Sequence, residues 1–294
     1  MPNARFAQLP SVRLEYFEHG HGPHRVVLVH GFEASARIWN EVQLALPQDL
    51  YTSIAINNRG AGNSDAPLDD GAYSVAHFAA DAHALVAGLG WQGVTLAGHS
   101  MGGATALQFA CDHSQCLAGL VLLNPVNPDG RSGTAAEVEL RIAAFLAARR
   151  TRLAASAQQA DSSALAGMPA EAPNWRTLLD ADMAAAPECR LRGSLRSIHA
   201  IRLGERLGRL PMPVLLACGD RDELIPLGDM LATWKRLPAG SGLQVWHGIG
   251  HSPNLECPRA LAALLCQFIE QPAPLREIRK PQYVAPQARS GGVT

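Results

Sequence analysis

Residues 98–102 read Gly-His-Ser-Met-Gly, the pattern G-x-S-x-G, and they lie between two contrasting segments. The apolar run 94–97 precedes them, and the helix-forming run 104–110 follows them. This context is typical of a nucleophile elbow, a sharp strand-to-helix turn that presents a serine. Such a turn needs unusual backbone angles and close packing, which glycine tolerates because it has no Cβ. The pattern therefore predicts that Ser100 is a nucleophile, and an ordinary glycine-rich turn is the alternative.

A serine hydroxyl is a weak nucleophile, so Ser100 needs a base and an acid that orients the base. With an elbow of this kind, the expected order along the chain is serine, acid, histidine. His251 follows the predicted strand 243–246 in the sequence Gly-His-Ser-Pro, and a glycine-flanked loop after a strand suits a catalytic base. We therefore predict His251 as the base, with His247 as the local alternative.

Three acidic residues follow the predicted strand 214–218, namely Asp220, Asp222 and Glu223. Each of them lies at the sheet edge where the histidine base is expected, so position alone does not separate them. Two of the three are expected to be solvated carboxylates of a turn. Asp129, which follows an earlier strand, is the less favoured alternative.

Hydrolysis at a carbonyl also needs donors for the oxyanion of the transition state, and fixed backbone N–H groups supply them best. One predicted donor is the N–H of Met101, at the positive end of the helix that follows the serine. The second is the N–H of Phe32. It lies in the loop 30–35, His-Gly-Phe-Glu-Ala-Ser, directly after the predicted strand 25–29.

The composition is that of a globular chain large enough for one domain with an insertion. Of its 294 residues, 47% are hydrophobic and 17% charged, which provides a substantial core. A formal net charge of −1 creates no field that would attract nucleic acid or an acidic membrane. The chain shows neither a long apolar run nor a secretory signal, so we expect a cytoplasmic protein without membrane partners.

The cysteines favour the same compartment. The six cysteines include no C-x-x-C pair, and several lie in apolar stretches, as expected of buried free thiols in a reducing cytoplasm. Cys111 and Cys116 are expected on or just past one helix and form no metal-binding pattern. We expect neither a metal nor another cofactor.

Short apolar runs alternate with helical patterns, which favours an α/β fold with a mostly parallel sheet. The predicted strands cover residues 12–18, as an edge strand, and 25–29, 51–56, 94–97, 119–123, 214–218 and 243–246. Helices are predicted over residues 36–46, 74–89 and 258–269, besides the one that follows the elbow. The continuous apolar runs are typical of strands that are buried on both faces.

Between the predicted strands 119–123 and 214–218, the pattern changes. Residues 134–207 contain no strand-like run and are rich in Ala, Leu and Arg. Thr134 and Glu137 have the spacing of a helix capping box, and prolines at 169, 173 and 187 divide the segment. We predict a helical insertion between two strands. The Pro-, Arg- and Gly-rich chain beyond Gln271 is expected to be mobile.

Several motifs together resemble the α/β-hydrolase fold family, over most of residues 10–270. They are, in the family's order, His-Gly-Phe at 30–32, Asn-Arg-Gly-Ala-Gly-Asn-Ser at 58–64, Gly-His-Ser-Met-Gly-Gly at 98–103, and the segments 219–226 and 250–253. The family pattern G-x-x-D-x-x-x-P falls on Gly219, Asp222 and Pro226, so the resemblance singles out Asp222 as the acid. The chain has Asn58 where the family usually has Asp, in a loop that is structural, and this departure leaves the triad unaffected.

The resemblance implies the α/β-hydrolase fold, with a mostly parallel central sheet flanked by helices. It also implies that residues 128–207 form a helical cap over the pocket. The core would then consist of residues 1–127 and 208–271, followed by a tail at 272–294.

The expected function is a serine hydrolase similar to carboxylesterases. It would cleave an ester, lactone or thioester of a small-molecule substrate through Ser100, His251 and Asp222 and an acyl-enzyme. The serine argues against the family's epoxide hydrolases and haloalkane dehalogenases, which have Asp at the elbow. A C–C bond hydrolase acting on a diketone-like substrate would use the same triad and is the first alternative. The others are a catalytically inactive ligand-binding protein and a cofactor-independent oxygenase.

Overall fold

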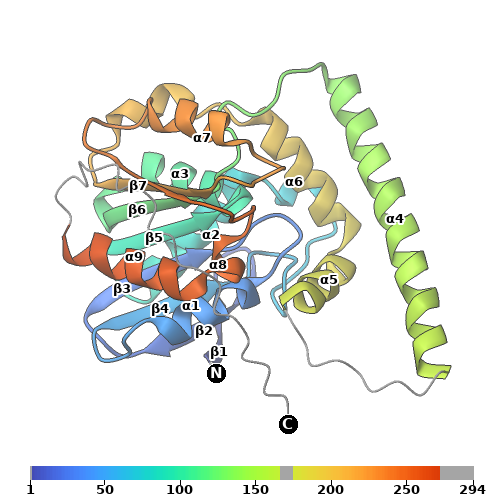
Figure 1. Ribbon diagram of the computed structural model, residues 1–294, viewed down its shortest axis with the longest axis horizontal. Coiled ribbons are helices and arrows are strands. Elements are labelled where there is room, and N and C mark those ends of the chain that lie inside the picture. The colour runs from blue at the N-terminus through green and yellow to red at the C-terminus, as the bar shows by residue number, and fades with distance from the viewer. Residues whose placement is uncertain (1, 166–174, 272–294) are drawn as a thin grey trace, which may run out of the picture.

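A computed structural model describes residues 2–165 and 175–271 (Figure 1). Its centre is an eight-stranded sheet with the strand order β1-β2-β4-β3-β5-β6-β7-β8. The second strand pairs antiparallel with both of its neighbours, and the remaining pairs are parallel. The strands are β1 (Asn3–Gln8), β2 (Arg13–Gly20), β3 (His24–Val29), β4 (Tyr51–Ile56), β5 (Val94–His99), β6 (Leu117–Leu123), β7 (Val214–Gly219) and β8 (Gly242–Trp246).

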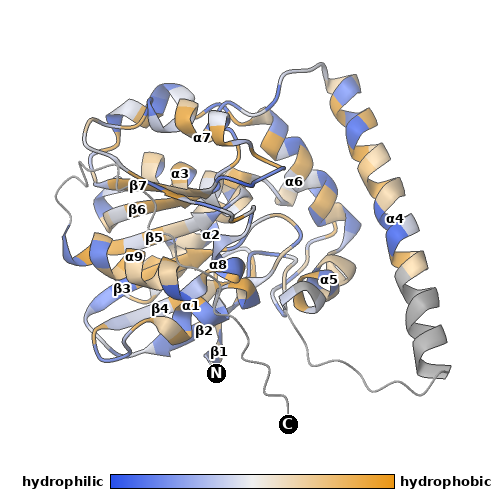
Figure 2. Ribbon diagram, in the orientation of Figure 1, coloured by the Kyte–Doolittle hydropathy of each residue, from blue (hydrophilic) through white to orange (hydrophobic). Residues whose placement is uncertain are grey.

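Helices cover both faces of this sheet. They are α1 (Asn40–Ala45), α2 (Val75–Gly88), α3 (Met101–Asp112), α7 (Leu227–Trp234), α8 (Pro253–Glu256) and α9 (Pro258–Glu270). The predicted helices are confirmed, although the first is divided into a short 3-10 helix, Ala36–Trp39, and α1. In Figure 2 the central strands are mostly hydrophobic, whereas the covering helices carry residues of both kinds. This is the pattern of a sheet buried between two helical layers.

All the predicted strands are present, but the predicted edge strand is not at the edge. β2, which contains the predicted strand 12–18, pairs with β4 on one side and with β1 on the other. The expectation was wrong because β1 gives no apolar alternation. Most of its residues Asn3–Gln8 are exposed, so the strand has no continuous apolar face that a sequence pattern could show.

The strands at the centre of the sheet are buried on both faces. In β3, Val27 and Val29 pack into an apolar cluster with residues of α2 and α3, and Val26 and Leu28 pack into a second cluster with residues of α1 and α9. All four side chains are fully buried. Alternate residues of a strand point to opposite faces, which explains why the sequence of such a strand is continuously apolar.

Between β6 and β7, the described residues form helices and loops and no strand, as predicted. The helices are α4 (Ala135–Leu165), α5 (Trp175–Ala185) and α6 (Glu188–Ala200), which lie together on one side of the sheet (Figure 1). The capping box at the start of α4 is confirmed: the Thr134 N–H donates to Glu137 Oε2 at 2.7 Å, and the Glu137 N–H donates to Thr134 Oγ1 at 3.3 Å. Pro187 separates α5 from α6. The predicted breaks at residues 169 and 173 and the tail 272–294 lie outside the described residues.

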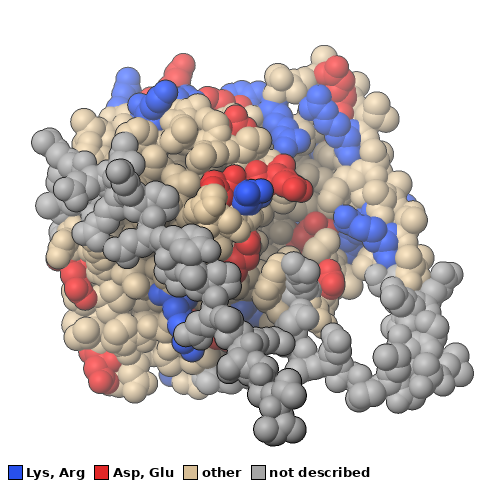
Figure 3. Space-filling model, viewed as in Figure 1, with Lys and Arg blue, Asp and Glu red and all other residues tan. Residues whose placement is uncertain are grey.

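All six cysteines are free thiols, as the sequence predicts. In the part of the chain that the structure describes, no helix is long and apolar enough to cross a membrane. On the face of the molecule shown in Figure 3, acidic and basic side chains are interspersed, in keeping with the net charge of −1.

We expect the buried ion pair between Arg59 and Asp81 to be essential for stability. Two hydrogen bonds, of 2.8 and 2.7 Å, join the side chains, and both residues are buried between α2 and the loop after β4. Asp81→Ala leaves an unpaired buried guanidinium, so the free energy of unfolding in urea should fall by about 3–5 kcal/mol. Asp112→Ala is the control, because Asp112 pairs with Arg206 at a partly exposed position and should cost less than about 1 kcal/mol. Equal losses in the two variants would contradict the prediction.

Candidate active site

The site lies where the strand order reverses, at the carboxyl ends of β3 and β5. These two strands are parallel neighbours in which Val29 lies opposite Gly98. The loop after β3 and the turn after β5 therefore leave the sheet side by side. A Cβ added to Gly31 would lie only 3.0 Å from Ser100 Cβ, which shows how closely the loop approaches the turn. Ligands of parallel α/β sheets bind at such a reversal of strand order.

The predicted strand-to-helix turn at Ser100 is present. Ser100 has φ 55° and ψ −118°, a backbone conformation that is disfavoured for a residue with a Cβ. A Cβ on Gly98 would come within 2.0 Å of the Gly102 oxygen, and one on Gly102 within 2.3 Å of the Val29 oxygen. The turn therefore requires both glycines. Met101 is the first residue of α3, so its N–H lies at the positive end of that helix.

Asp222 and His251 are joined by a hydrogen bond of 2.7 Å from Nδ1 to Oδ2. The Asp222 carboxylate also accepts from the N–H groups of Leu224 and Ile225, at 2.8 and 2.9 Å, and from Asn124 Nδ2 at 2.6 Å. Burial acts to raise the pKa of Asp222, but the hydrogen bonds and the proximity of His251 outweigh it and hold that pKa below its usual value. The carboxylate therefore stays ionised and keeps the imidazole in one orientation.

The other acidic candidates have different partners. Asp220 accepts from His247 Nδ1 at 2.6 Å and from the Gly248 N–H at 2.7 Å, in a loop outside the cavity described below. Asp129 forms an ion pair with Arg236. Glu223 is exposed. Of the four acids considered, the structure thus brings Asp222 to His251, and it places His247 with Asp220 instead.

Two further residues near the pair were not predicted. The Nε2–H of His99 donates to the carbonyl oxygen of His251 at 2.8 Å, and burial lowers the pKa of His99 to about 3, so this ring is neutral. Asn124 reaches Asp222 from the end of β6. Its position directly after the predicted strand 119–123 is the signal that could have identified it, since the carboxyl ends of parallel strands meet at one edge.

A cavity of about 630 Å³ contains this site. Ser100, His251 and Phe32 line it from the sheet side, and Phe145 of α4 and Leu195 of α6 line it from the insertion. The phenyl rings of Phe32 and Phe145 contact each other, with centroids 5.5 Å apart. Ser100, His251 and Phe32 therefore face a largely apolar and partly open cavity.

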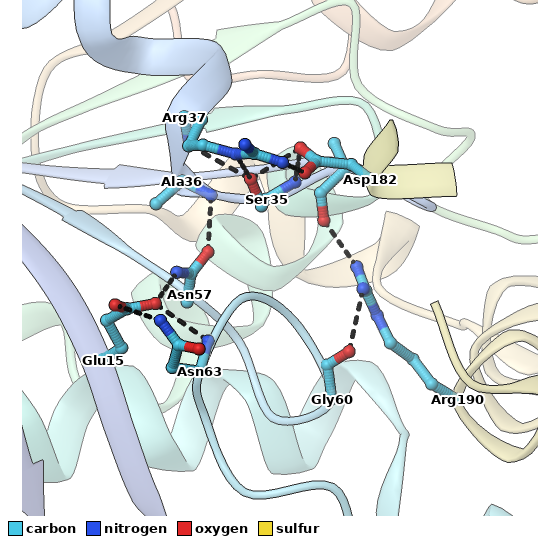
Figure 4. Close-up of polar contacts among 10 residues, drawn as sticks. Glu15, Ser35, Ala36, Arg37, Asn57, Gly60, Asn63, Asp182 and Arg190 are labelled. Atoms are coloured by element: carbon cyan, nitrogen blue, oxygen red, sulfur yellow. Dashed lines mark hydrogen bonds and ion pairs between the residues drawn. The ribbon is translucent and has the colours of Figure 1, made fainter. Parts of the chain in front are cut away.

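Polar contacts join the insertion to the loop after β3 (Figure 4). Asp182 of α5 accepts from the N–H and Oγ of Ser35, at 3.1 and 2.6 Å, and also from Arg37. Arg190 of α6 donates to the carbonyl oxygens of Ala34, at 2.8 Å, and of Gly60, at 3.2 Å. Arg190 is fully buried, and burial lowers its pKa to about 10. Helices α5 and α6 thus hold Ala34 and Ser35, in the same loop as Phe32.

Comparison with known proteins agrees with this architecture. The sequence model of the alpha/beta hydrolase fold matches residues 24–258. A proposed carbamate hydrolase of Variovorax paradoxus is 31% identical over 211 residues, which cover 70% of this chain and 78% of that protein. An uncharacterized protein of Mycobacterium tuberculosis is 27% identical over 93% of this chain and 83% of its own length. The structure of a thermophilic esterase from Thermogutta terrifontis has a TM-score of 0.74 at 22% identity, covering 92% of this chain and 99% of that one.

The match over most of the chain places it in a family. The chain belongs to the alpha/beta hydrolase fold family and is a hydrolase. The likeness to the esterase structure, at 22% identity, concerns the fold alone.

We predict that Asn124 contributes to the low pKa of Asp222. Asn124 has φ 42°, so Asn124→Gly removes the amide without straining the backbone. Without that donor, the pKa of Asp222 should rise, as measured by carboxyl NMR titration. When the pKa of a carboxyl group is lower in the folded than in the unfolded protein, its ionised form stabilises the fold at pH values above the unfolded-state pKa. This stabilisation is lost as the pH falls through the folded-state pKa. The variant should therefore be less stable than the wild type at pH 7, with a smaller difference in acid.

Asn63→Gly is the matched control for this measurement. Asn63 Nδ2 also donates to a carboxylate, Glu15 Oε1 at 2.8 Å, but in a separate group of residues (Figure 4). Its substitution should leave the pKa of Asp222 unchanged. An unchanged pKa of Asp222 in Asn124→Gly would refute the role assigned to Asn124.

Proposed function

We propose that the chain is a serine hydrolase that cleaves an ester, lactone or thioester bond of a small molecule through Ser100, His251 and Asp222. The observation that carries this proposal is the 2.7 Å hydrogen bond between Asp222 and His251, beside a cavity that also contains Ser100 on its strained turn. Nucleophile, base and acid follow one another along the chain in the order that this fold uses.

In the proposed reaction, the His251 Nδ1–H donates to Asp222, which leaves Nε2 free to accept the proton of Ser100. The serine oxygen attacks the carbonyl carbon, and His251 then protonates the leaving group. Asp222 stabilises the positive charge that the imidazole acquires. Water activated by His251 hydrolyses the acyl-enzyme and releases the acid product.

The tetrahedral intermediates carry a negative oxygen, for which we propose the N–H groups of Phe32 and Met101 as donors. Two observations support this assignment. The close approach of Gly31 to Ser100 places the start of the Phe32 loop beside the serine, and Met101 lies at the N-terminus of α3. Donors fixed in this way need no reorganisation as charge develops, and each is worth about 10²–10³ in rate.

We also propose that residues 128–207 form a cap that encloses the substrate, between the core segments 1–127 and 208–271. Side chains of α4, α5 and α6 line the cavity opposite Ser100, which supports this role. Enclosure strengthens electrostatic interactions and excludes bulk water from the acyl-enzyme. The cavity volume suits a small molecule, and the free thiols support a cytoplasmic location.

Removal of the Ser100 hydroxyl should abolish hydrolysis. In Ser100→Ala, kcat/KM for p-nitrophenyl butyrate should fall by about 10³ or more, because no nucleophile remains. A fluorophosphonate probe should label the wild type and not this variant, as measured by intact mass. Ser114→Ala, at the half-buried start of the 3-10 helix Ser114–Cys116 and outside the cavity lining, is the matched control and should react and be labelled normally. Retained activity in Ser100→Ala, or cleavage of diketones in preference to esters, lactones and thioesters, would contradict the proposal.

Loss of the Asp182 carboxylate should weaken substrate binding. Asp182→Ala removes the contacts that join α5 to Ser35 and Arg37, so the cavity wall carried by α5 loses its support. We expect KM to rise about tenfold, with a smaller change in kcat. Asp180→Ala, an exposed position on the same helix, should leave both constants unchanged. A normal KM in Asp182→Ala, measured on folded protein, would show that these contacts do not shape the cavity.

A further inference from the structure

Glu33 is a buried carboxylate in the wall of the candidate active-site cavity. It directly follows Phe32, and only 8% of its surface is exposed. Its φ is 60°, in the left-handed region that residues with a Cβ disfavour. Backbone strain of this kind is concentrated at functional sites, where the surrounding structure maintains it. An exposed glutamate would avoid the cost of burying a carboxylate, and a glycine would avoid the backbone strain. Both features of Glu33 therefore require an explanation.

One carboxylate oxygen of Glu33 is buried without a hydrogen bond to any described residue. Among the described residues, Glu33 Oε1 is buried and has no hydrogen-bond partner. The nearest cationic nitrogen, Arg149 Nε, lies 3.8 Å away and is itself without a hydrogen bond in the same part of the chain. A charge-assisted hydrogen bond between these groups would measure about 2.7–2.9 Å. The two groups therefore form a long ion pair without a hydrogen bond.

Arg149 is held in place by other contacts. Its Nη2 donates to the carbonyl oxygens of Met183, Ala184 and Ala186, at 2.6, 3.2 and 2.9 Å. These carbonyls belong to the end of α5 and the turn after it, where a cation also stabilises the helix dipole. Movement of Arg149 toward Glu33 would break these bonds. Arg149 therefore stabilises the negative charge of Glu33 electrostatically but does not donate a hydrogen bond to Oε1.

The surrounding charges favour a neutral partner for Glu33. Burial raises the pKa of Glu33, while the guanidinium groups of Arg152, Arg149 and Arg190 act in the opposite direction and favour the carboxylate. Burial is the larger effect, so the pKa of Glu33 lies above its usual value. The three guanidinium groups would nevertheless repel a further cation. A neutral hydroxyl or amide N–H can donate to the carboxylate without that repulsion.

We propose that Glu33 is a specificity-determining residue that accepts a hydrogen bond from a neutral donor, a hydroxyl or amide N–H, on the substrate of the Ser100 site. This inference rests on the proposed function and narrows its substrate class to esters, lactones or thioesters that carry such a donor. A buried polar group left unpaired disfavours ligands that lack the complementary group, so the site discriminates against purely alkyl substrates.

The first test compares substrates that differ only in the donor. Ethyl 3-hydroxybutyrate and ethyl 3-methoxybutyrate have similar electronic effects at the carbonyl, but only the first has a donor on the acyl side. The pair 2-hydroxyethyl and 2-methoxyethyl butyrate tests the alcohol side. In the wild type, kcat/KM should favour the hydroxyl compound about tenfold or more in at least one pair. No preference in either pair, or faster cleavage of ethyl 3-aminobutyrate than of the hydroxy ester, would overturn the proposal.

The second test assigns the preference to Glu33. Glu33→Met keeps the length of the side chain and removes the acceptor, so the hydroxyl-to-methoxy ratio should fall to about one. Glu33→Gln retains an acceptor oxygen and should retain part of the preference, even if the methionine variant is unstable. Glu41→Met, on the exposed side of α1, is the matched control and should keep the wild-type ratio. If Glu33→Gln and Glu33→Met each keep the wild-type ratio of kcat/KM between hydroxyl and methoxy substrates, Glu33 does not contact the donor.

Failure of this inference differs from failure of the proposed function. If the enzyme neither cleaves any ester of the panel nor reacts with the fluorophosphonate probe, the serine hydrolase proposal is wrong. If it cleaves the esters and is labelled at Ser100 but does not distinguish hydroxyl from methoxy compounds, only the role of Glu33 is wrong.

Discussion

The parallel pairing of β3 with β5 is the constraint on which the rest of the site depends. Because Val29 lies opposite Gly98, the loop that carries Phe32 and the turn that carries Ser100 must leave the sheet together. A Cβ at Gly102 would come within 2.3 Å of the Val29 oxygen, and one at Gly31 would lie 3.0 Å from Ser100 Cβ, so the two segments pack closely. The neighbouring strands β6 and β7 then end beside them and contribute Asn124 and Asp222 to the same edge.

Much of this arrangement could be predicted because its signals are local. The glycines around Ser100 and the apolar run before it define the turn, and continuous apolar strands define a sheet buried on both faces. Local signals could not decide between Asp222 and Asp220 as the acid. Both follow the same strand, and only the resemblance to a family pattern separated them. The structure brings Asp222 to His251 through the hydrogen bonds of its own turn, from Leu224 and Ile225.

The features that the sequence did not reveal depend on contacts between distant segments. Strand β1 has no buried face, so nothing in its side chains marks it as a strand. The bonds from Asp182 to Ser35 and from Arg190 to Ala34 join residues more than a hundred positions apart, and charge and spacing do not identify such partners. Glu33 likewise resembles any loop glutamate until its burial and its missing partner are known.

The contacts of Asp182 and Arg190 have a consequence for how such an enzyme acquires new substrates. Helices α5 and α6, which line the cavity, are bonded to Ser35 and Ala34 in the same loop as Phe32. In the proposed mechanism, this loop would therefore support both the cavity wall and the oxyanion. Substitutions in α5 and α6 that reshape the wall while preserving these two anchors can alter selectivity independently of rate. Substitutions that remove either contact would also disturb the loop that carries Phe32, so divergence is expected mainly at the side chains between the two contacts.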